Sequence, residues 1–289
     1  MSSAQLIDGK SMAQDVKREL ASRIKRLESE AGVRPGLAVI LVGDDPASEV
    51  YVRGKIRDCR DVGIRSEWIR LPDSNPEEDL LRQIDRLNED PRFHGILVQL
   101  PLPRHISAER VIHRIRPEKD VDGFHPINVG KMVIGQEAFL PCTPYGIMEM
   151  LRRSGISVAG KHAVVVGRSN IVGKPVSILL QQADATVTLC HSKTRDLAAH
   201  TRRADILVVA VGKARVIGPE HVKPGAVVID VGINRTEEGR LTGDVDFEAV
   251  RSIASHITPV PGGVGPMTRA MLLVNTVRAA ERTAGIGQG

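Results

Sequence analysis

The amino-acid sequence predicts an α/β fold made of two α/β domains with a cleft between them. In both halves of the chain, short continuous apolar runs alternate with amphipathic stretches of helical length. Such runs are typical of strands in a parallel sheet that helices cover on both faces, because neither face of the strand meets water. Over Arg116–Leu140 this alternation gives way to Pro, Gly, Asp and Asn, which indicates an irregular connection at a domain junction.

The first half begins with a helix and continues as alternating strands and helices. Apolar residues recur every three or four positions from Met12 to Ala31, and Gly32 is expected to end this amphipathic helix. The stretches after it are predicted as strand, helix, strand, helix and strand in turn: Leu37–Val42, Pro46–Val62, Ile64–Leu71, Pro76–Asn88 and Gly95–Leu100.

The second half repeats this order after an opening helix, which Thr143 caps, Pro144 begins and Gly155 ends. We expect residues 1–140 to form the first domain and residues 141–289 the second, with the last helix able to pack back on the first. The predicted strands are His162–Val166, Thr186–Cys190, Ile206–Val211 and Val227–Val231, and the predicted helices are Lys174–Ala183, Arg195–Ala204 and a last one at about 267–282.

Length, charge and composition exclude several classes of protein. The 289 residues exceed the ~100–200 of a typical domain, and a net charge of +5 is too small for a protein that wraps a polyanion. Four Phe, two Tyr and one Trp cannot supply the stacking platforms of a single-strand nucleic-acid binder. No apolar run approaches the ~20 residues that span a bilayer, and Asp8 and Lys10 stand where a signal peptide needs apolar residues. We therefore expect a cytoplasmic protein with neither nucleic-acid nor membrane partners.

The cysteines indicate neither a disulfide framework nor a metal site. Cys59, Cys142 and Cys190 are far apart and form no CxxC pair, so no metal is expected. Cys142 precedes a predicted helix, whose N-terminus offers the alternative of a reactive thiol. Since no His or Asn stands near it in sequence, a packed structural thiol is the favoured interpretation.

A glycine turn between a buried strand and a helix predicts that the second domain is of the Rossmann type. Gly167 and Gly173 follow the strand, and Pro175 lies in the first turn of the helix. Unpaired N–H groups at such a helix start stabilise a phosphate. The spacing differs from GxGxxG, so a plain strand-to-helix turn stays open as the alternative.

The end of the next strand favours NADP over NAD. A Rossmann unit for NAD places a carboxylate there, about 20 residues after the first glycines, for the ribose hydroxyls. Here the strand ends in Cys190-His191-Ser192-Lys193, and Arg168 stands in the glycine turn, so donors and cations suit a 2′-phosphate instead. A solvated polar loop is the alternative.

The stretch Pro259–Pro266 packs three glycines and three prolines into eight positions ahead of the last helix. Such a stretch suits close backbone approach to a flat ligand followed by a rigid stop. A tight interdomain turn is an equally good interpretation of this pattern.

In the first domain, Ser48, Tyr51 and Lys55 fall on one face of the helix that Asp45-Pro46 begins. If that face meets a cleft, the lysine amine is desolvated and becomes a general acid or base near neutral pH. Alone, such a lysine is usually a solvated surface residue.

Two polar residues, Gln99 and Asp122, support the interpretation that this helix face meets a cleft. Gln99 ends an apolar strand, where ligands of open parallel sheets bind, and Asp122 could accept two N–H donors from a heterocycle. The alternative for Asp122 is a turn residue.

Taken together, these motifs resemble the bacterial bifunctional methylenetetrahydrofolate dehydrogenase/cyclohydrolase family over essentially the whole chain. Six segments carry the resemblance in order: Tyr51–Lys55 (YVRGK), Gln99–Pro103 (QLPLP), Lys119–Phe124 (KDVDGF), Pro141–Pro144 (PCTP), Gly167–Pro175 (GRSNIVGKP) and Pro261–Thr268 (PGGVGPMT).

The resemblance implies NADP-dependent oxidation of 5,10-methylenetetrahydrofolate to the 5,10-methenyl compound and its hydrolysis to 10-formyltetrahydrofolate, by a homodimer. It implies that Lys55 is the catalytic lysine, that Gln99 is its partner, and that Tyr51 and Asp122 position and anchor the folate. It further implies a folate site with Ser48, Pro261, Gly262 and Gly263, and an NADP site with Gly167, Arg168, Ser169, Gly173, Ser192 and Ile233. Two alternatives from the residues alone are an NADP-dependent amino-acid or shikimate-type dehydrogenase and a non-catalytic NADP-sensing module.

Overall fold

The computed structural model describes residues 3–236 and 238–286, which form two compact units. The six-stranded unit comprises the residues up to Gln14 together with Thr143–Thr268, and the three-stranded unit comprises Asp15–Cys142 together with the residues from Arg269 onward. Both units contain parallel sheets with helices, which confirms the predicted fold class. The chain thus passes between the units after Gln14, Cys142 and Thr268, whereas the domain limits predicted from the sequence keep all of 1–140 together.

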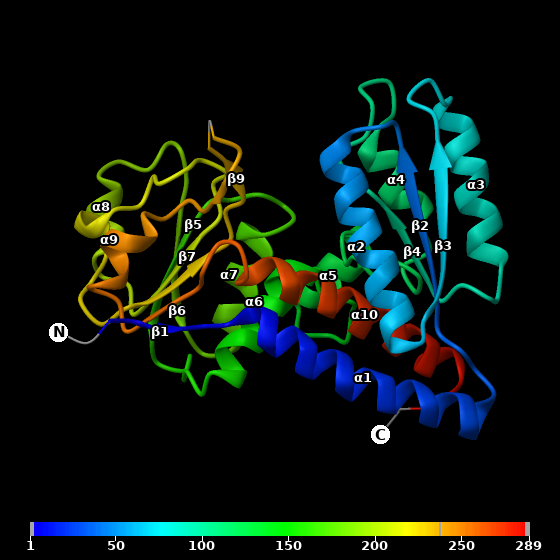
Figure 1. Cartoon of the computed structure of the whole chain (residues 1–289), viewed down its shortest axis with the longest axis horizontal. Coiled ribbons are helices and arrows are strands. Elements are labelled where there is room, and N and C mark those ends of the chain that lie inside the picture. Colours follow the sequence, from blue (N-terminus) through cyan, green and yellow to red (C-terminus); the bar gives the residue numbers. More distant parts are fainter. Residues whose placement is uncertain (1–2, 237, 287–289) are drawn as a thin grey trace. The chain divides into compact units, whose positions relative to one another are not determined.

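The three-stranded unit has a parallel sheet in the order β3-β2-β4 (Figure 1). The central strand β2 (Gly36–Val42) pairs with β3 (Arg65–Leu71) on one side and with β4 (Gly95–Val98) on the other. Every residue of β2 and β4 is buried, which is why both sequences are continuous apolar runs. The edge strand β3 mixes exposed and half-buried residues, and its pattern in the sequence is correspondingly weaker.

Four helices of this unit lie between or after its strands. Two were predicted, α2 (Pro46–Val62) and α3 (Glu77–Glu89), whereas α4 (Ala108–Arg114) and α5 (Pro126–Val133) were not. The prediction of an irregular connection throughout 116–140 is therefore wrong. The helix α5 starts because His125 Nδ1 accepts the N–H of Ile127 at 3.2 Å and Pro126 takes the first position. Its two buried residues are too few to draw an apolar stripe in the sequence.

The six-stranded unit has an all-parallel sheet in the order β1-β11-β8-β7-β5-β6. After β1, which lies at one edge, the chain re-enters the sheet at β5, moves outward to β6, and then returns to the other side of β5 for β7 and β8. This reversal creates a switch point at β5, which is where doubly wound sheets bind their ligands. The strands are β1 (Gln5–Leu6), β5 (His162–Val166), β6 (Thr186–Cys190), β7 (Ile206–Val209), β8 (Val227–Asp230) and β11 (His256–Ile257).

The remaining elements include the two long helices in which the chain passes between the units. These are α1 (Gly9–Ala31) and α10 (Val264–Thr283), and both begin three residues before the predicted start. The shorter elements are α6 (Cys142–Arg153), α7 (Gly173–Gln182), α8 (Leu197–Thr201), α9 (Phe247–Arg251), the 3₁₀ turn Pro219–His221 and the antiparallel pair β9 (Asn234–Arg235) and β10 (Leu241–Thr242).

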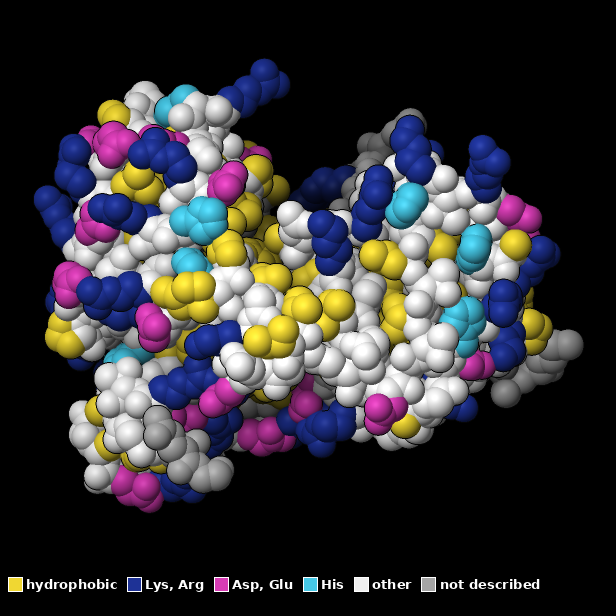
Figure 2. Space-filling model, turned by 180° about the vertical axis from the view of Figure 1, so that it is seen from behind, with side chains coloured by type: hydrophobic (Ala, Val, Ile, Leu, Met, Phe, Trp, Pro, Cys, Tyr) yellow, Lys and Arg dark blue, Asp and Glu magenta, His cyan; other side chains and the backbone are white. Residues whose placement is uncertain are grey.

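Both cations and carboxylates lie on the face shown in Figure 2. Among residues 3–236 and 238–286, no helix is both long and apolar enough to cross a bilayer.

Candidate active site

The start of α2 sets the positions of Ser48, Tyr51 and Lys55. Asp45 caps this helix, since its carboxylate accepts the N–H of Ser48 at 2.8 Å, and Pro46 occupies the first position. The three side chains are not equally solvated: Ser48 is buried, Lys55 is half-buried, and Tyr51 is 40% exposed. The Lys55 amine is thus partly withdrawn from water, while the Tyr51 ring remains accessible.

Gln99 holds the Lys55 amine at the carboxyl end of β4. Lys55 Nζ donates to Gln99 Oε1 at 3.0 Å, and Gln99 Nε2 donates to the carbonyl of Leu100 at 2.6 Å. The second bond orients the amide so that its oxygen faces the amine. The backbone N–H of Gln99 bonds to Ile40 O at 2.9 Å, so the side chain starts from a fixed point of the sheet. Because Gln99 Oε1 is an uncharged acceptor, it can hold the Lys55 amine in either its protonated or its deprotonated form.

The surroundings of Lys55 favour its uncharged form. Burial is the main cause that lowers the pKa of Lys55, and the nearby Arg269 guanidinium lowers it further, while Asp122 opposes them. Burial in turn raises the pKa of Asp122, against the pull of the Lys55 charge and of the nearby Cys142 thiol. The charges of Lys55 and Asp122 thus each favour the ionised form of the other group.

Asn275 and Cys142 fix the backbone that carries Asp122. The fully buried Asn275 amide donates to the carbonyls of Val121 and Leu140 at 2.9 and 3.0 Å, and Cys142 Sγ donates to Val121 O at 3.4 Å. Burial raises the pKa of the Cys142 thiol well above its usual value, which disfavours a thiolate nucleophile there. The thiol is instead a packed hydrogen-bonding group.

Sequence reasoning missed Asn275, Asp120 and Arg269. Asn275 had a usable signal, because it is an amide directly after the apolar run Ala270–Val274. Asp120 is buried two residues before Asp122, and its carboxylate accepts the N–H groups of Phe124 and His125 and the amide of Asn128. These bonds define the loop between Asp122 and α5. Neither Asp120 nor Arg269 stands in a local pattern that distinguishes it from a surface charge.

The glycine turn after β5 is tightly packed. A Cβ at Gly167 would collide with the Ala210 carbonyl, and one at Gly173 would collide with the Gly167 carbonyl, so neither position accepts a side chain. Ser169 Oγ accepts the N–H groups of Val172 and Gly173 at 3.2 and 3.3 Å, at the start of α7. Side-chain-free backbone at Gly167 and Gly173 thus lies together with the N-terminus of α7 at the switch point, and Ser169 caps that N-terminus.

The polar end of β6 lies beside this turn. Residues Val166 and Cys190 are paired in the sheet, and the N–H of Gly167 bonds to Cys190 O at 2.9 Å. Arg168 and Ser192 follow the two strand ends, each two residues further along the chain, and both are exposed. Donors and a cation therefore occupy the position where an NAD site has a carboxylate, which fits a 2′-phosphate.

The Pro261–Gly263 stretch lies within the six-stranded unit. A Cβ at Gly263 would lie 2.6 Å from Pro259 O, so the close packing there requires glycine. Ile233 approaches the same segment, since its Cδ1 lies 3.8 Å from where a Cβ of Gly265 would be. The structure thus groups Ser48, Tyr51, Lys55, Gln99 and Asp122 in the three-stranded unit, and Pro261–Gly263 with the six predicted cofactor residues in the other.

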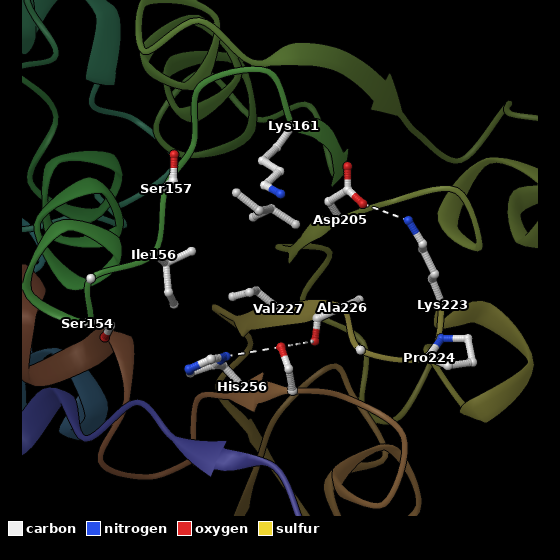
Figure 3. A pocket seen from close by; sticks show the side chains of 14 residues that line it. Ser154, Ile156, Ser157, Lys161, Asp205, Lys223, Pro224, Ala226, Val227 and His256 are labelled. Atoms are coloured by element: carbon white, nitrogen blue, oxygen red, sulfur yellow. Dashed lines mark hydrogen bonds and ion pairs between the residues drawn. The ribbon is translucent and has the colours of Figure 1, made fainter.

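A cavity of about 480 Å³ opens in the six-stranded unit, at the amino ends of β7, β8 and β11 (Figure 3). Lys161, Asp205, Lys223 and His256 are among its lining residues, and Lys223 Nζ bonds to Asp205 Oδ1 at 2.6 Å. Ligands of open parallel sheets bind at the carboxyl ends of the strands. This cavity is therefore not part of the candidate active site. Within the described ranges, no cluster of His, Cys, Asp and Glu could hold a metal ion.

Comparisons with known proteins match both halves of the chain to one family. Residues 7–122 match the family model "Tetrahydrofolate dehydrogenase/cyclohydrolase, catalytic domain", and residues 141–284 match its "NAD(P)-binding domain". A curated relative, "Bifunctional protein FolD" of Geobacillus thermodenitrificans, is 64% identical over 281 residues, which cover 97% of this chain and 99% of that protein.

Solved structures of methylenetetrahydrofolate dehydrogenase/cyclohydrolases also match this chain over nearly its whole length. The bifunctional FolD methylenetetrahydrofolate dehydrogenase/cyclohydrolase of Campylobacter jejuni matches with a TM-score of 0.95 at 50% identity, covering 97% of this chain and 99% of that one. The Trypanosoma brucei methylenetetrahydrofolate dehydrogenase-cyclohydrolase, complexed with NADP cofactor and inhibitor, matches with a TM-score of 0.94 at 43% identity, covering 98% and 99%.

Proposed function

We propose that this chain, which belongs to the tetrahydrofolate dehydrogenase/cyclohydrolase family, catalyses two consecutive reactions of tetrahydrofolate derivatives. It oxidises 5,10-methylenetetrahydrofolate to the 5,10-methenyl compound with NADP, and it hydrolyses that product to 10-formyltetrahydrofolate. The hydrogen bond between Lys55 and Gln99, beside Asp122, is the observation that carries the assignment. It places a partly desolvated amine where a proton has to move.

The oxidation step requires orientation more than proton transfer. NADP supplies the hydride acceptor when it is bound. Removing a hydride from a carbon between two nitrogens leaves a resonance-stabilised cation, so the residues of the chain need only hold two rings in register. Gly167, Ser169 and Gly173 would hold the diphosphate at the start of α7, and Arg168 with Ser192 would hold the 2′-phosphate. Ile233 and Pro261–Gly263 would border the folate and the nicotinamide.

The hydrolysis step requires three proton transfers. Water adds to the methenyl carbon, and one of its protons passes to the free amine of Lys55, which Gln99 holds in place. The bond from the carbon to N5 then breaks as the Lys55 ammonium gives its proton to N5, and the hydroxyl on the carbon releases its own proton to solvent, which leaves the formyl group on N10. Asp122 would anchor the heterocycle, with Ser48 and Tyr51 lining the folate site on α2.

The two alternative functions lack this support. A shikimate-type or amino-acid dehydrogenase needs a lysine and carboxylate pair that acts on a hydroxyl or amine, whereas both halves of the chain match models of the folate family. A non-catalytic NADP-sensing module does not explain why the Lys55 amine is held by Gln99. We further propose a cytoplasmic homodimer, for which sedimentation of the full chain at micromolar concentration is the test.

A coupled assay tests the function directly. The chain is mixed with 5,10-methylenetetrahydrofolate and NADP, and the appearance of NADPH is followed together with the decay of the methenyl product. We expect both signals, with NAD supporting a slower first step. NADP reduction without enzymatic methenyl decay would contradict the second activity, and the absence of any reduction would contradict both.

A further inference from the structure

A buried carboxylate that the proposed mechanism does not use lies one turn after Lys55 on α2. The side chain of Asp58 is only 2% exposed, and it pairs with two cations: Lys17 Nζ from α1, and Arg269 Nε from α10 at 2.7 Å. A buried charge requires such partners, because an unpaired one is strongly destabilising. The two ion pairs with Asp58 therefore hold the side chains of Lys17 and Arg269 against α2.

Arg269 is thereby held next to the backbone of the Lys55 turn. It lies over Gly54, the residue before Lys55: a Cβ at Gly54 would be 3.6 Å from Arg269 Nη1 and 3.8 Å from Cζ. The guanidinium therefore lies just outside the space that a methyl side chain at Gly54 would fill, beside this stretch of α2. Since arginine does not lose its proton in proteins, it is a permanent positive charge at that place.

The titratable groups around Lys55 come from four segments. Asp122 follows β4 along the chain, Cys142 begins α6, Cys59 lies on α2 itself, and Arg269 lies on α10. Asp122 and the two thiols favour the ammonium form, whereas burial and Arg269 favour the free amine. Lys17 acts on the neighbouring Cys59 thiol instead. Arg269 is thus the cation placed to bias Lys55.

We propose that Arg269 is a positioning residue for the hydrolysis step, anchored by Asp58 so that a fixed positive charge lies beside Gly54, in the turn of α2 that carries Lys55. The inference rests on the proposed function, because it takes Lys55 as the proton carrier. A free amine is what the attacking water needs, and a fixed cation nearby adds to the effect of burial in favouring that state, without contacting substrate. Asp58 acts through Arg269, and Lys17 completes the neutralisation of Asp58.

The pH dependence of methenyl hydrolysis tests this role in three variants. Arg269→Met removes the charge but keeps an apolar stem, Arg269→Lys keeps the charge, and Lys17→Met removes the other partner of Asp58. The last variant is a matched control, because it removes the other cation of the same buried carboxylate, and Lys17 is not among the charges that act on Lys55. The kcat for hydrolysis is measured from neutral to alkaline pH, with the uncatalysed rate subtracted, and thermal unfolding is recorded for each variant.

We expect Arg269→Met to shift the rise of kcat to higher pH and to lower kcat at neutral pH by up to about tenfold, with recovery in alkaline buffer. Arg269→Lys should restore most of the wild-type profile, and Lys17→Met should keep it. An unshifted profile in Arg269→Met, or equal shifts in Arg269→Met and Lys17→Met, would overturn the proposal. A rise in the folate KM without a pH shift would also overturn it, since Arg269 would then act on substrate.

Asp58→Asn tests the anchoring by the sign of its effect. If Asp58 anchors Arg269, its loss frees the guanidinium and the profile shifts to higher pH. If the carboxylate only adds negative charge near Lys55, its loss shifts the profile to lower pH, and the anchoring part fails. If Asp58→Asn does not fold, the comparison of Arg269→Met with Arg269→Lys still tests the proposal. Wild-type protein without hydrolysis would contradict the proposed function itself, whereas normal wild-type hydrolysis with unshifted variants contradicts this inference alone.

Discussion

At the scale of single residues, Lys55 and Gln99 are 44 positions apart in the chain but share one hydrogen bond. The sequence could indicate each of them, Lys55 by its helix face and Gln99 by its place at a strand end. It could not indicate their distance, because that depends on how α2 packs against the β2–β4 ladder. Nor could it indicate Arg269 or Asn275, whose importance arises from contacts with segments more than a hundred residues away.

Replacing the amine of Lys55 tests the central assignment. We expect Lys55→Met to lower kcat for methenyl hydrolysis by about a hundred- to ten-thousandfold, the range that general acid–base catalysis contributes. Oxidation should continue, because hydride removal transfers no proton. Arg57→Met, which removes an exposed cation two residues further along α2, is the control. Hydrolysis at the wild-type rate in Lys55→Met would refute the role of this amine.

Removing the guanidinium in the glycine turn tests the 2′-phosphate site. Arg168→Ala should raise the KM for NADP by roughly ten- to a hundredfold, since a charged hydrogen bond is lost, and should leave the folate KM nearly unchanged. Lys161→Ala is the matched control, because Lys161 is an exposed cation at the opposite end of β5. Equal increases of both KM values in Arg168→Ala would count against phosphate contact.

At the scale of elements, the sequence predicted every strand of four residues or more and the helices with a long apolar stripe. The two-residue strands β1 and β11 and the helix α5 could not be predicted in this way. Their stability comes from neighbours: β1 pairs with β11, and β11 pairs with β8. A two-residue strand has no period of its own, and α5 has too few buried residues to show one.

The contact between α10 and the Asp122 segment depends on Asn275. Asn275→Leu keeps the volume but leaves the carbonyls of Val121 and Leu140 without this donor. We expect the free energy of unfolding to fall by about 1–3 kcal/mol and the folate KM to rise, because the loop that carries Asp122 loses its support. Urea unfolding and steady-state kinetics measure the two effects. An unchanged folate KM would show that Asp122 does not depend on this support.

At the scale of the whole molecule, the three buried thiols can report separately on the two units. Cys59 and Cys142 lie in the three-stranded unit and Cys190 in the other. Burial raises the pKa of all three thiols, that of Cys59 to about 12, so little thiolate forms in the folded protein at mildly alkaline pH.

We therefore expect alkylation to be much slower in the native protein than in the unfolded one. Cys190, at the end of the edge strand β6, should react first. Mass spectrometry of peptides after timed labelling measures the order. Rapid native labelling of Cys59 or Cys142 would show that the interior of the three-stranded unit opens more easily than its packing indicates.

The passage of the chain between the two units has a consequence for synthesis on the ribosome. The three-stranded unit needs residues from Arg269 onward, among them Asn275, which bonds to the carbonyls beside Asp122. These residues are translated after the whole six-stranded unit has been made. The three-stranded unit, although its residues begin at Asp15, can therefore reach its final packing only after α10 has emerged from the ribosome.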